Sequence, residues 1–184
     1  MNKSKCDVHC PYKGNEYVIS KEFGGYNKAI LFIGHRGDER VLQPALFGNE
    51  HEQAMFETDS GKALSEILNH CKLTTENIRF TNLLKCLLPQ NGEVEEKAYS
   101  YCERRLKNQI VHLHPRAIVA FGEFCFRYMF PEAYHNHFLN QVGKIYVYNN
   151  QPVLIEHHLS KIYRLKKPEE AEKIRNFLVE RRAI

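Results

Sequence analysis

The chain of 184 residues is long enough for one domain with a sizeable core, and we expect residues 1–184 to form a single domain. Hydrophobic residues make up 43% and charged residues 26% of the chain, as in ordinary soluble proteins, and a net charge of +4 does not by itself demand a nucleic-acid partner. The longest apolar stretches are too short to span a bilayer and the N-terminus lacks a hydrophobic secretory core, so we expect a cytoplasmic protein without a membrane segment.

The first half of the chain alternates strand-like and helix-like segments. Residues 28–34 form a continuous apolar run that ends in glycine, which is typical of a strand buried on both faces. Residues 35–56 are polar and lack a clear period, which indicates a functional loop rather than a simple connection. An Asp-Ser pair then predicts the start of a helix over 61–70, and residues 78–86 predict a second strand.

The second half continues the same alternation. The predicted elements are a helix over 93–114, a strand over 117–122, a helix over 123–130, strands over 144–149 and 152–156, and a helix from Pro168. Strands that alternate with helices predict an α/β fold, and we expect a three-layer α/β/α sandwich around a central, mainly parallel four-stranded sheet. Such sheets bind ligands beyond the carboxyl ends of their strands. The candidate site segments are therefore the loops after Gly34, around 82–86, after Gly122 and after Glu156.

Six cysteines in a chain expected to be cytoplasmic need an explanation other than disulfide bonds. Cys71 and Cys125 lie in apolar, helix-like runs and fit a core role. The other four would come together if the N-terminal segment packs beside the second strand and the next helix: Cys6, Cys10, Cys86 and Cys102. Four thiolates without a matching histidine pair suit an iron–sulfur cluster or a tetrahedral zinc ion. On spacing alone, buried structural cysteines are an equally good interpretation.

Motifs around these cysteines extend through most of the chain. An N-terminal cysteine pair is followed by Asn82-Leu-Leu-Lys-Cys86, by Tyr101-Cys102-Glu-Arg-Arg-Leu106-Lys-Asn-Gln109-Ile110, and by a strand that ends at Gly122. This combination resembles family 4 of the uracil-DNA glycosylases, the branch that contains an iron–sulfur cluster. The resemblance implies the uracil-DNA glycosylase fold and a structural [4Fe–4S] cluster on the four cysteines, with zinc as the alternative.

The same resemblance implies a pocket for a base that is flipped out of DNA. Phe56, in a Phe-x-x-x-x-Gly-x-x-Leu pattern, would stack on the base, because an aromatic face can hold an extruded base. Asn82 would read the hydrogen-bonding edge with its amide donor and acceptor. His158 would lie beside the base carbonyl on which negative charge develops, with His157 as a rival for that role. The alternatives are an ordinary core aromatic at Phe56 and a local backbone contact at Asn82.

Residues 158–164 resemble the family's His-Pro-Ser-x-x-x-Arg segment, although leucine replaces the proline. In the family, the loop that follows the histidine inserts into the duplex. The resemblance implies DNA contacts by Ser160, Lys161 and Arg164, with further lysines after them near phosphates. We therefore expect single- or double-stranded DNA as the partner of a monomeric protein.

The first motif departs from the family pattern, in which Gly-Glu-x-Pro-Gly and acidic residues follow the first strand. Here His35 and Arg36 follow Gly34, and Asp38 and Glu39 come after them. One hypothesis is a monofunctional glycosylase that hydrolyses the N-glycosidic bond of uracil, with Asp38 or Glu39 positioning water or stabilising the cationic sugar. A second is a pocket for another modified or damaged base, with His35 and Arg36 as donors. A third is a protein that binds nucleic acid or a base without cleaving it. For Asp38 and Glu39 themselves, the alternative to catalysis is a solvated loop.

Overall fold

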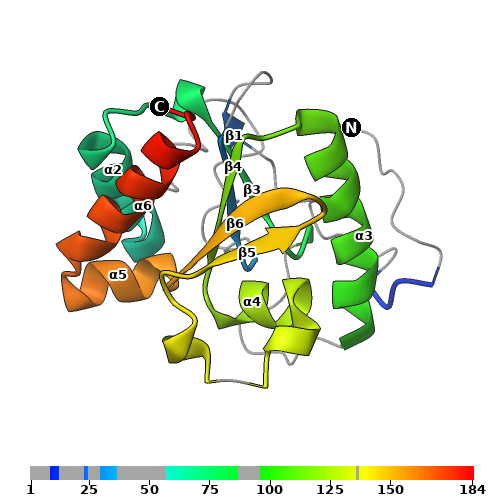
Figure 1. Ribbon diagram of the computed structural model, residues 1–184. Helices are drawn as coiled ribbons and strands as arrows, with labels where there is room; N and C mark the ends of the chain where they lie inside the picture. The colour runs from blue at the N-terminus through cyan, green and yellow to red at the C-terminus, as the bar shows by residue number, and fades with distance from the viewer. Residues whose placement is uncertain (1–8, 13–22, 25–29, 37–56, 87–95, 136) are drawn as a thin grey trace.

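A β-sheet separates two layers of helices in the molecule (Figure 1). The computed structural model describes residues 9–12, 23–24, 30–36, 57–86, 96–135 and 137–184. Within these residues the sheet has six strands in the order β1-β3-β2-β4-β6-β5. Their bounds are Phe23–Gly24 for β1, Ile30–Gly34 for β2, Ile78–Asn82 for β3, Ala117–Phe121 for β4, Ile145–Tyr148 for β5 and Gln151–Glu156 for β6.

The four central strands, β3, β2, β4 and β6, are parallel neighbours, and β1 and β5 pair antiparallel at the two edges. The predicted three-layer sandwich with a mainly parallel sheet is therefore confirmed. The sheet is wider than the four strands predicted because an antiparallel strand extends each edge. The strand predicted over 144–149 contains β5, whereas β1 has two residues and is too short to show a pattern in the sequence.

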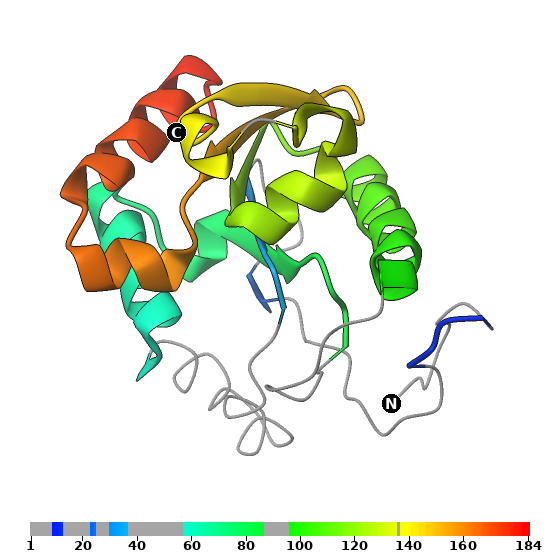
Figure 2. The same ribbon diagram turned by 90° about the horizontal axis from the view of Figure 1, so that it is seen from below.

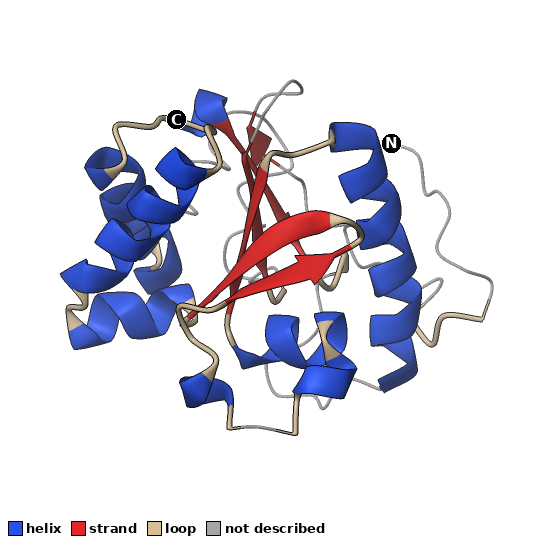
Figure 3. Cartoon of the chain, in the orientation of Figure 1, coloured by secondary structure: helices blue, strands red, loops and turns tan. Residues whose placement is uncertain are grey.

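Helices cover both faces of the sheet in the part of the chain that the structure describes. α2, α5 and α6 lie on one face, and α3 and α4 lie on the other (Figures 1 and 3). Their bounds are Asp59–His70 for α2, Glu96–Leu113 for α3, Glu123–Met129 for α4, Leu159–Leu165 for α5 and Pro168–Glu180 for α6. Short 3₁₀ helices span Thr75–Asn77, Pro131–Ala133 and Phe138–Asn140. Among the described helices, none combines the length and the apolar character needed to cross a membrane.

The alternation of side chains along the strands builds two separate cores. In β2, Ile30 and Phe32 belong to the core shared with α2 and α6, and Leu31 and Ile33 belong to the core shared with α3 and α4. All five residues of β2 are buried, and so are all five of β4. The prediction that these apolar runs are strands buried on both faces is confirmed.

Helix α2 begins where a hydroxyl group caps its first turn. The Oγ1 atom of Thr58 accepts a hydrogen bond from the backbone N–H of Gly61 at 3.0 Å, which satisfies an amide that has no partner inside the helix. Leu64, Ile67 and Leu68 are buried, as the helical pattern predicts. α2 also packs against α5, so it supports the segment that follows β6.

The second parallel strand is shorter than the range predicted over 78–86. β3 ends at Asn82 because the next two backbone N–H groups turn back toward the end of β2. Leu83 donates to the carbonyl oxygen of Gly34 at 2.7 Å, and Leu84 donates to that of His35 at 2.9 Å. Two backbone hydrogen bonds therefore join the chain after Asn82 to the end of β2 and the residue that follows it.

The segment after His158, expected to be a loop that enters DNA, is the helix α5. Its first turn is capped by the side chain of His158, and its inward face buries Leu159 and Ile162 in the core with α2. The apolar spacing of three residues between these two side chains suits one face of a helix. Residues of this segment therefore project from a short helix rather than from an irregular loop.

Candidate functional site

The residues that follow the parallel strands meet at one edge of the sheet, the side from which Figure 2 is viewed. The strand register places Gly34 of β2 opposite Asn82 of β3, and Phe121 of β4 opposite Glu156 of β6. Parallel strands that end at the same level bring their following loops together, and this edge is where such sheets bind ligands. The loops predicted as site segments are the ones gathered here.

Asn82 fills the space that Gly34 leaves open. A Cβ atom added to Gly34 would lie 2.6 Å from Oδ1 of Asn82 and 3.0 Å from Cζ of Phe80. Because real contacts of a Cβ atom are not this short, a side chain at Gly34 and the present position of the Asn82 amide exclude each other. Asn82 is half-buried, so its amide lies at the edge of the sheet with one side held by the backbone of β2.

His158 has one ring nitrogen fixed as a hydrogen-bond acceptor. Its Nδ1 atom lies 3.3 Å from the backbone nitrogen and 2.8 Å from Oγ of Ser160. A backbone N–H can only donate, so Nδ1 carries no proton and the neutral ring carries its proton on Nε2. Protein atoms around the ring and the charge of Arg164 lower the pKa of His158, although part of the side chain stays accessible to solvent. The side chain is thus a neutral Nε2–H donor.

Gly122, at the end of β4, gives His158 its position. Its φ angle is +91°, a conformation that residues with side chains rarely adopt, and a Cβ atom there would lie 3.2 Å from Cδ2 of His158. The backbone N–H of Gly122 donates to the carbonyl oxygen of Glu156 at 2.8 Å. The ends of β4 and β6 are therefore joined directly beneath the His158 ring.

His35, the residue after β2, is a neutral side chain with a fixed ring. Its Nε2 atom lies 2.9 Å from the hydroxyl oxygen of Tyr99. Burial lowers the pKa of His35 to about 3, and the charges of Arg36 and His158 act in the same direction. His35 follows the end of β2 and His158 follows the end of β6, so both imidazoles lie at the carboxyl edge of the sheet. The structure therefore brings His35 and His158 to one edge, together with Asn82.

Aromatic residues of α3 and α4 hold His35 in place. The ring of Phe124 stacks on His35 with centroids 4.2 Å apart, and that of Tyr128 stacks on Tyr99 with centroids 3.7 Å apart. Phe124 and Tyr128 are one helical turn apart on α4, so both reach the same plane. Sequence reasoning missed all three aromatic residues, because aromatic side chains at helical spacing ordinarily indicate core packing.

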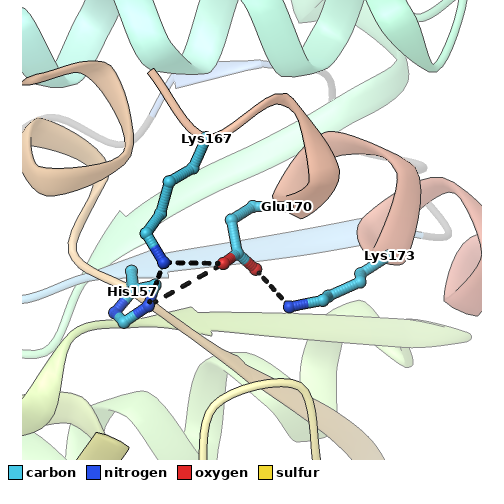
Figure 4. A network of polar contacts seen from close by, with 4 residues as sticks. All are labelled: His157, Lys167, Glu170 and Lys173. Atoms are coloured by element: carbon cyan, nitrogen blue, oxygen red, sulfur yellow. Dashed lines mark hydrogen bonds and ion pairs between the residues drawn. The ribbon is translucent and has the colours of Figure 1, made fainter. Parts of the chain in front are cut away.

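His157 belongs to a buried polar network with Lys167, Glu170 and Lys173 (Figure 4). It is 6% exposed, and its Nε2 atom lies 3.3 Å from Nζ of Lys167. Glu170 of α6 lies between Lys167 and Lys173. Of the two adjacent histidines, His158 is therefore the one available to a ligand at the strand ends.

The polar residues of α5 have several internal partners. The hydroxyl group of Ser160 contacts His158, so it contributes to the orientation of that ring. Nε of Arg164 pairs with Oδ2 of Asp59 on α2 at 2.8 Å, and the Arg164 side chain is 71% exposed. Lys161 is half-buried and lies close enough to lower the pKa of His157. These residues form the exposed border of the site on the α5 side.

Four of the residues predicted for the site lie outside the described part of the chain. They are Cys6, Asp38, Glu39 and Phe56. Arg36 lies within it and is half-buried beside His35. The functions predicted for the carboxylates and for the stacking aromatic residue stay predictions.

Three of the four cysteines predicted as cluster ligands are described, and all three are buried: Cys10, Cys86 and Cys102. Cys86 and Cys102 belong to the core on the α3 side, and Tyr12 packs against the same core. The N-terminal segment that contains Cys10 therefore lies on the α3 side of the sheet. Among the described residues, no three His, Cys, Asp or Glu side chains are arranged to hold a metal ion. Cys71 and Cys125 are buried in the two cores, as predicted.

Known proteins with similar sequences include uracil-DNA glycosylases. The model of the uracil DNA glycosylase superfamily matches residues 22–179. A type-4 uracil-DNA glycosylase of Saccharolobus solfataricus is 30% identical over 142 residues, and one of Archaeoglobus fulgidus is 29% identical over 133 residues. The alignments cover 77% and 71% of this chain but 61% and 59% of the two relatives, so the chain spans less than two thirds of their length.

Proposed function

The chain belongs to the uracil DNA glycosylase superfamily, and from this membership we propose that it is a DNA glycosylase that excises a flipped-out base, uracil by default. The observation that supports this most directly is the orientation of His158. A neutral imidazole with its proton on Nε2 lies at the same edge of the sheet as the amide of Asn82. The relatives that match over most of the chain are named type-4 uracil-DNA glycosylases.

His158 would stabilise the leaving base. When the bond between the base and the sugar breaks, its electron pair stays on the base and negative charge develops on a carbonyl oxygen. The Nε2–H group, fixed because Nδ1 accepts from Ser160, would donate to that oxygen. A donor already oriented before the reaction needs no reorganisation when the charge appears, which is where its catalytic effect comes from.

Asn82 would select the base by its hydrogen-bonding edge. The amide group has a donor and an acceptor side by side, as an adjacent carbonyl and N–H of uracil require. Contact with Gly34 limits the rotation of this amide. We propose that Phe56 stacks on the same base. Because stacking accepts any base, the specificity would come from Asn82.

We propose that Asp38 or Glu39 completes the hydrolysis on the sugar side. The N-glycosidic bond breaks, the base leaves with the bonding electrons, and C1′ becomes cationic. A carboxylate close to C1′ stabilises this cation and orients a water molecule. The water oxygen bonds to C1′, its proton leaves to the carboxylate or solvent, and the base takes up a proton. The products are a free base and an abasic site.

A different modified or damaged base is the second candidate substrate. It is favoured by His35, which stands where the family motif has glutamate and is held by Tyr99 and Phe124. Because Nε2 of His35 faces the Tyr99 hydroxyl group, Nδ1 is the nitrogen left for a ligand. A neutral imidazole and the cationic Arg36 offer hydrogen bonds different from those of a carboxylate, and this changes which base fits.

The decisive experiment is a panel of labelled oligonucleotides, single-stranded and duplex, that contain uracil, deaminated purines or hydroxymethylated bases. After incubation with the protein, alkali cleaves the strand at each abasic site. We expect cleavage at uracil, or at one of the other bases if His35 has changed the specificity. Binding of DNA without cleavage of any oligonucleotide would instead identify a binding protein of the same fold.

We propose that Cys6, Cys10, Cys86 and Cys102 bind a [4Fe–4S] cluster with a structural role. The burial of the three described thiols, and the packing of Tyr12 against the core that contains Cys86 and Cys102, support this assignment. The ammonium group of buried Lys85, which donates to Oγ1 of Thr81 at 2.7 Å, adds positive charge close in sequence to Cys86. Thiolate ligands contribute negative charge, which such a cation offsets.

Iron and acid-labile sulfide of the purified protein test this assignment. We expect about four of each per chain, and a brown colour, for a [4Fe–4S] cluster. Replacement of Cys86 by serine should release the cluster and lower the melting temperature, whereas the same change at Cys71 should leave the iron content unchanged. One zinc ion per chain without iron would contradict the cluster and favour the tetrahedral alternative.

Replacement of Gly34 by alanine is expected to slow excision about 10-fold with little effect on stability. The backbone of Gly34 has no positive φ angle, so alanine fits the strand, but its Cβ atom would displace the Asn82 amide. Single-turnover excision and urea unfolding measure the two effects. Excision at the wild-type rate would mean that the Asn82 amide does not need its present position.

We also propose that the protein acts as a monomer in the cytoplasm and that residues 1–184 form one domain. Helices of the same chain cover both faces of the sheet, which supports a monomer. Cys71 and Cys125 are buried free thiols, which suits a reducing compartment. Light scattering of the protein with and without DNA would test the oligomeric state.

A further inference from the structure

The buried polar network around His157 has no part in the proposed reaction. In this network the carboxylate of Glu170 contacts residues at both ends of α5 (Figure 4). Oε1 of Glu170 lies 3.6 Å from Nζ of Lys167, which follows α5, and 3.8 Å from Nε2 of His157, which precedes it. Oε2 pairs with Nζ of Lys173 at 3.0 Å. The side chain of Glu170 is 2% exposed, so salt screens these contacts less than it screens surface pairs.

Lys167 is the direct link between the two ends of α5. Its ammonium group has only donors, so the contact of 3.3 Å requires Nε2 of His157 to accept. His157 is therefore neutral, in agreement with a pKa that is lowered by burial and by the charge of Lys167. The contact between His157 and Glu170 is then no ion pair. Lys167 contacts both His157 and Glu170 and so links them.

Glu156 adds a second carboxyl group to the same place, two residues before His158. It is fully buried, and with both carboxyl groups ionised neither of its oxygens has a hydrogen-bond donor among the described residues. A proton on Glu156 resolves this, because the protonated group can donate to the carboxylate of Glu170. Two adjacent buried carboxyl groups share one proton rather than both ionise.

The pKa values of the two carboxyl groups shift in opposite directions, and this indicates which group holds the shared proton. Burial raises the pKa of Glu156 to about 9, and the hydrogen bond and charge of Glu170 add to this effect. Burial also acts to raise the pKa of Glu170, but hydrogen bonds with Glu156 and Lys173 outweigh it and lower the pKa. Near neutral pH the proton therefore resides on Glu156, and Glu170 carries the charge that Lys167 and Lys173 neutralise.

We propose that Glu170 is a positioning residue: it fixes Lys167 and so the two ends of α5, and Glu156 completes the arrangement as a hydrogen-bond donor to Glu170. Helix α5 starts at its cap, His158, and contains Ser160, which orients the His158 ring. A shift of the helix would therefore move the Nε2–H donor relative to Asn82. The effect on excision rests on the proposed function, whereas the shared proton does not.

The positioning role is tested with two pairs of matched variants. Glu170→Gln is compared with Glu169→Gln, an exposed residue of the same helical turn, and Lys167→Gln is compared with Lys107→Gln, an exposed lysine of α3. Each pair removes the same charge inside and outside the network. At saturating DNA we expect the single-turnover rate constant to fall about 10-fold or more in Glu170→Gln and Lys167→Gln, with the control variants unchanged. Equal rates within both pairs would overturn the positioning role.

The shared proton is tested with Glu156→Gln, whose amide donates to Glu170 at every pH. The charged and titratable groups around Glu156 in the described residues are Glu170 and Lys173 of α6, with Lys167 and His157 at their border. Between the ordinary pKa of 4.5 and about 9, the folded protein holds a proton on Glu156 that the unfolded chain has lost, so rising pH destabilises the wild type. The melting temperature of Glu156→Gln should therefore exceed that of the wild type by an amount that grows from about pH 5 to about pH 9 and then stays constant.

The pH dependence of excision by Glu156→Gln distinguishes a positioning role from a purely structural role. Wild-type excision should decline as Glu156 ionises near pH 9, and this alkaline limb should be absent from the pH profile of Glu156→Gln. Carbon-13 NMR of labelled glutamate carboxyl groups follows the titration without any assay of activity. If no base is excised, the proposed function fails while the NMR and melting data still decide the shared proton. Titration of Glu156 near 4.5, with a constant difference in melting temperature, would overturn it.

Discussion

Replacing His158 with alanine is expected to lower the rate constant of base excision by about 100- to 1000-fold, the effect of losing one oriented donor to a developing anion. The Nδ1 atom accepts from the backbone of Ser160, so only Nε2–H can reach the base. Because the ring is exposed and caps a short helix, the melting temperature should change by a few degrees at most. Single-turnover cleavage assays and thermal unfolding give the two quantities.

Two further variants make this test specific. His112→Ala removes an exposed histidine from α3 and should leave excision unchanged. Ser160→Ala removes a hydroxyl contact but keeps the backbone N–H that fixes Nδ1, so the loss should be much smaller than for His158→Ala. If His158→Ala excises its base within about 3-fold of the wild-type rate, another group stabilises the leaving base, and His35, at the same edge of the sheet, is the next imidazole to examine.

The framework of the site followed from the sequence because its signals are local. Continuous apolar runs that end in Gly34 and Gly122 predicted buried strands and their carboxyl ends, and the structure has β2 and β4 there. The glycines themselves explain why these ends form a site. One leaves room for Asn82 and the other for His158, a relation that exists only after the strands are paired in register.

The partners of these residues could not be predicted, because they depend on packing between distant segments. Tyr99 and Phe124 occupy helical positions where an aromatic side chain ordinarily indicates core, yet their rings fix His35. The sequence predicts a loop in place of helix α5, because the first residues of this segment resemble a loop motif. The burial of Leu159 and Ile162 on α2 is what makes the segment helical.

The buried carboxyl pair shows a second limit of sequence reasoning. Glu170 lies in the first turn of a helix, where acidic residues are common on the surface, and Glu156 looks like the polar end of a strand. One feature of the sequence indicates that Glu156 is buried. The residues before it form an apolar run, as in a strand that is covered on both faces. A buried acid of this kind lowers stability as pH rises, so its presence beside His158 favours a role in the site over a role in stability.

Replacing Asn82 with alanine is expected to lower kcat/KM for the excised base by about 1000-fold, which corresponds to about 4 kcal/mol of transition-state stabilisation. The base that enters the pocket gives up its water contacts, and the Asn82 amide replaces them with one donor and one acceptor. Without the amide, both polar groups of the base edge stay unpaired, and each costs about 1–3 kcal/mol.

This loss should depend on the edge of the base, which separates it from a general loss of structure. Asn69→Ala, an exposed residue of α2, is the matched control and should bind and excise normally. Gly34→Ala, which displaces the amide but keeps it, should fall between Asn82→Ala and the wild type. Since both substitutions act on one group, combining them should cost no more than Asn82→Ala alone. Additive losses would mean that Gly34 acts on another part of the pocket and not through the Asn82 amide.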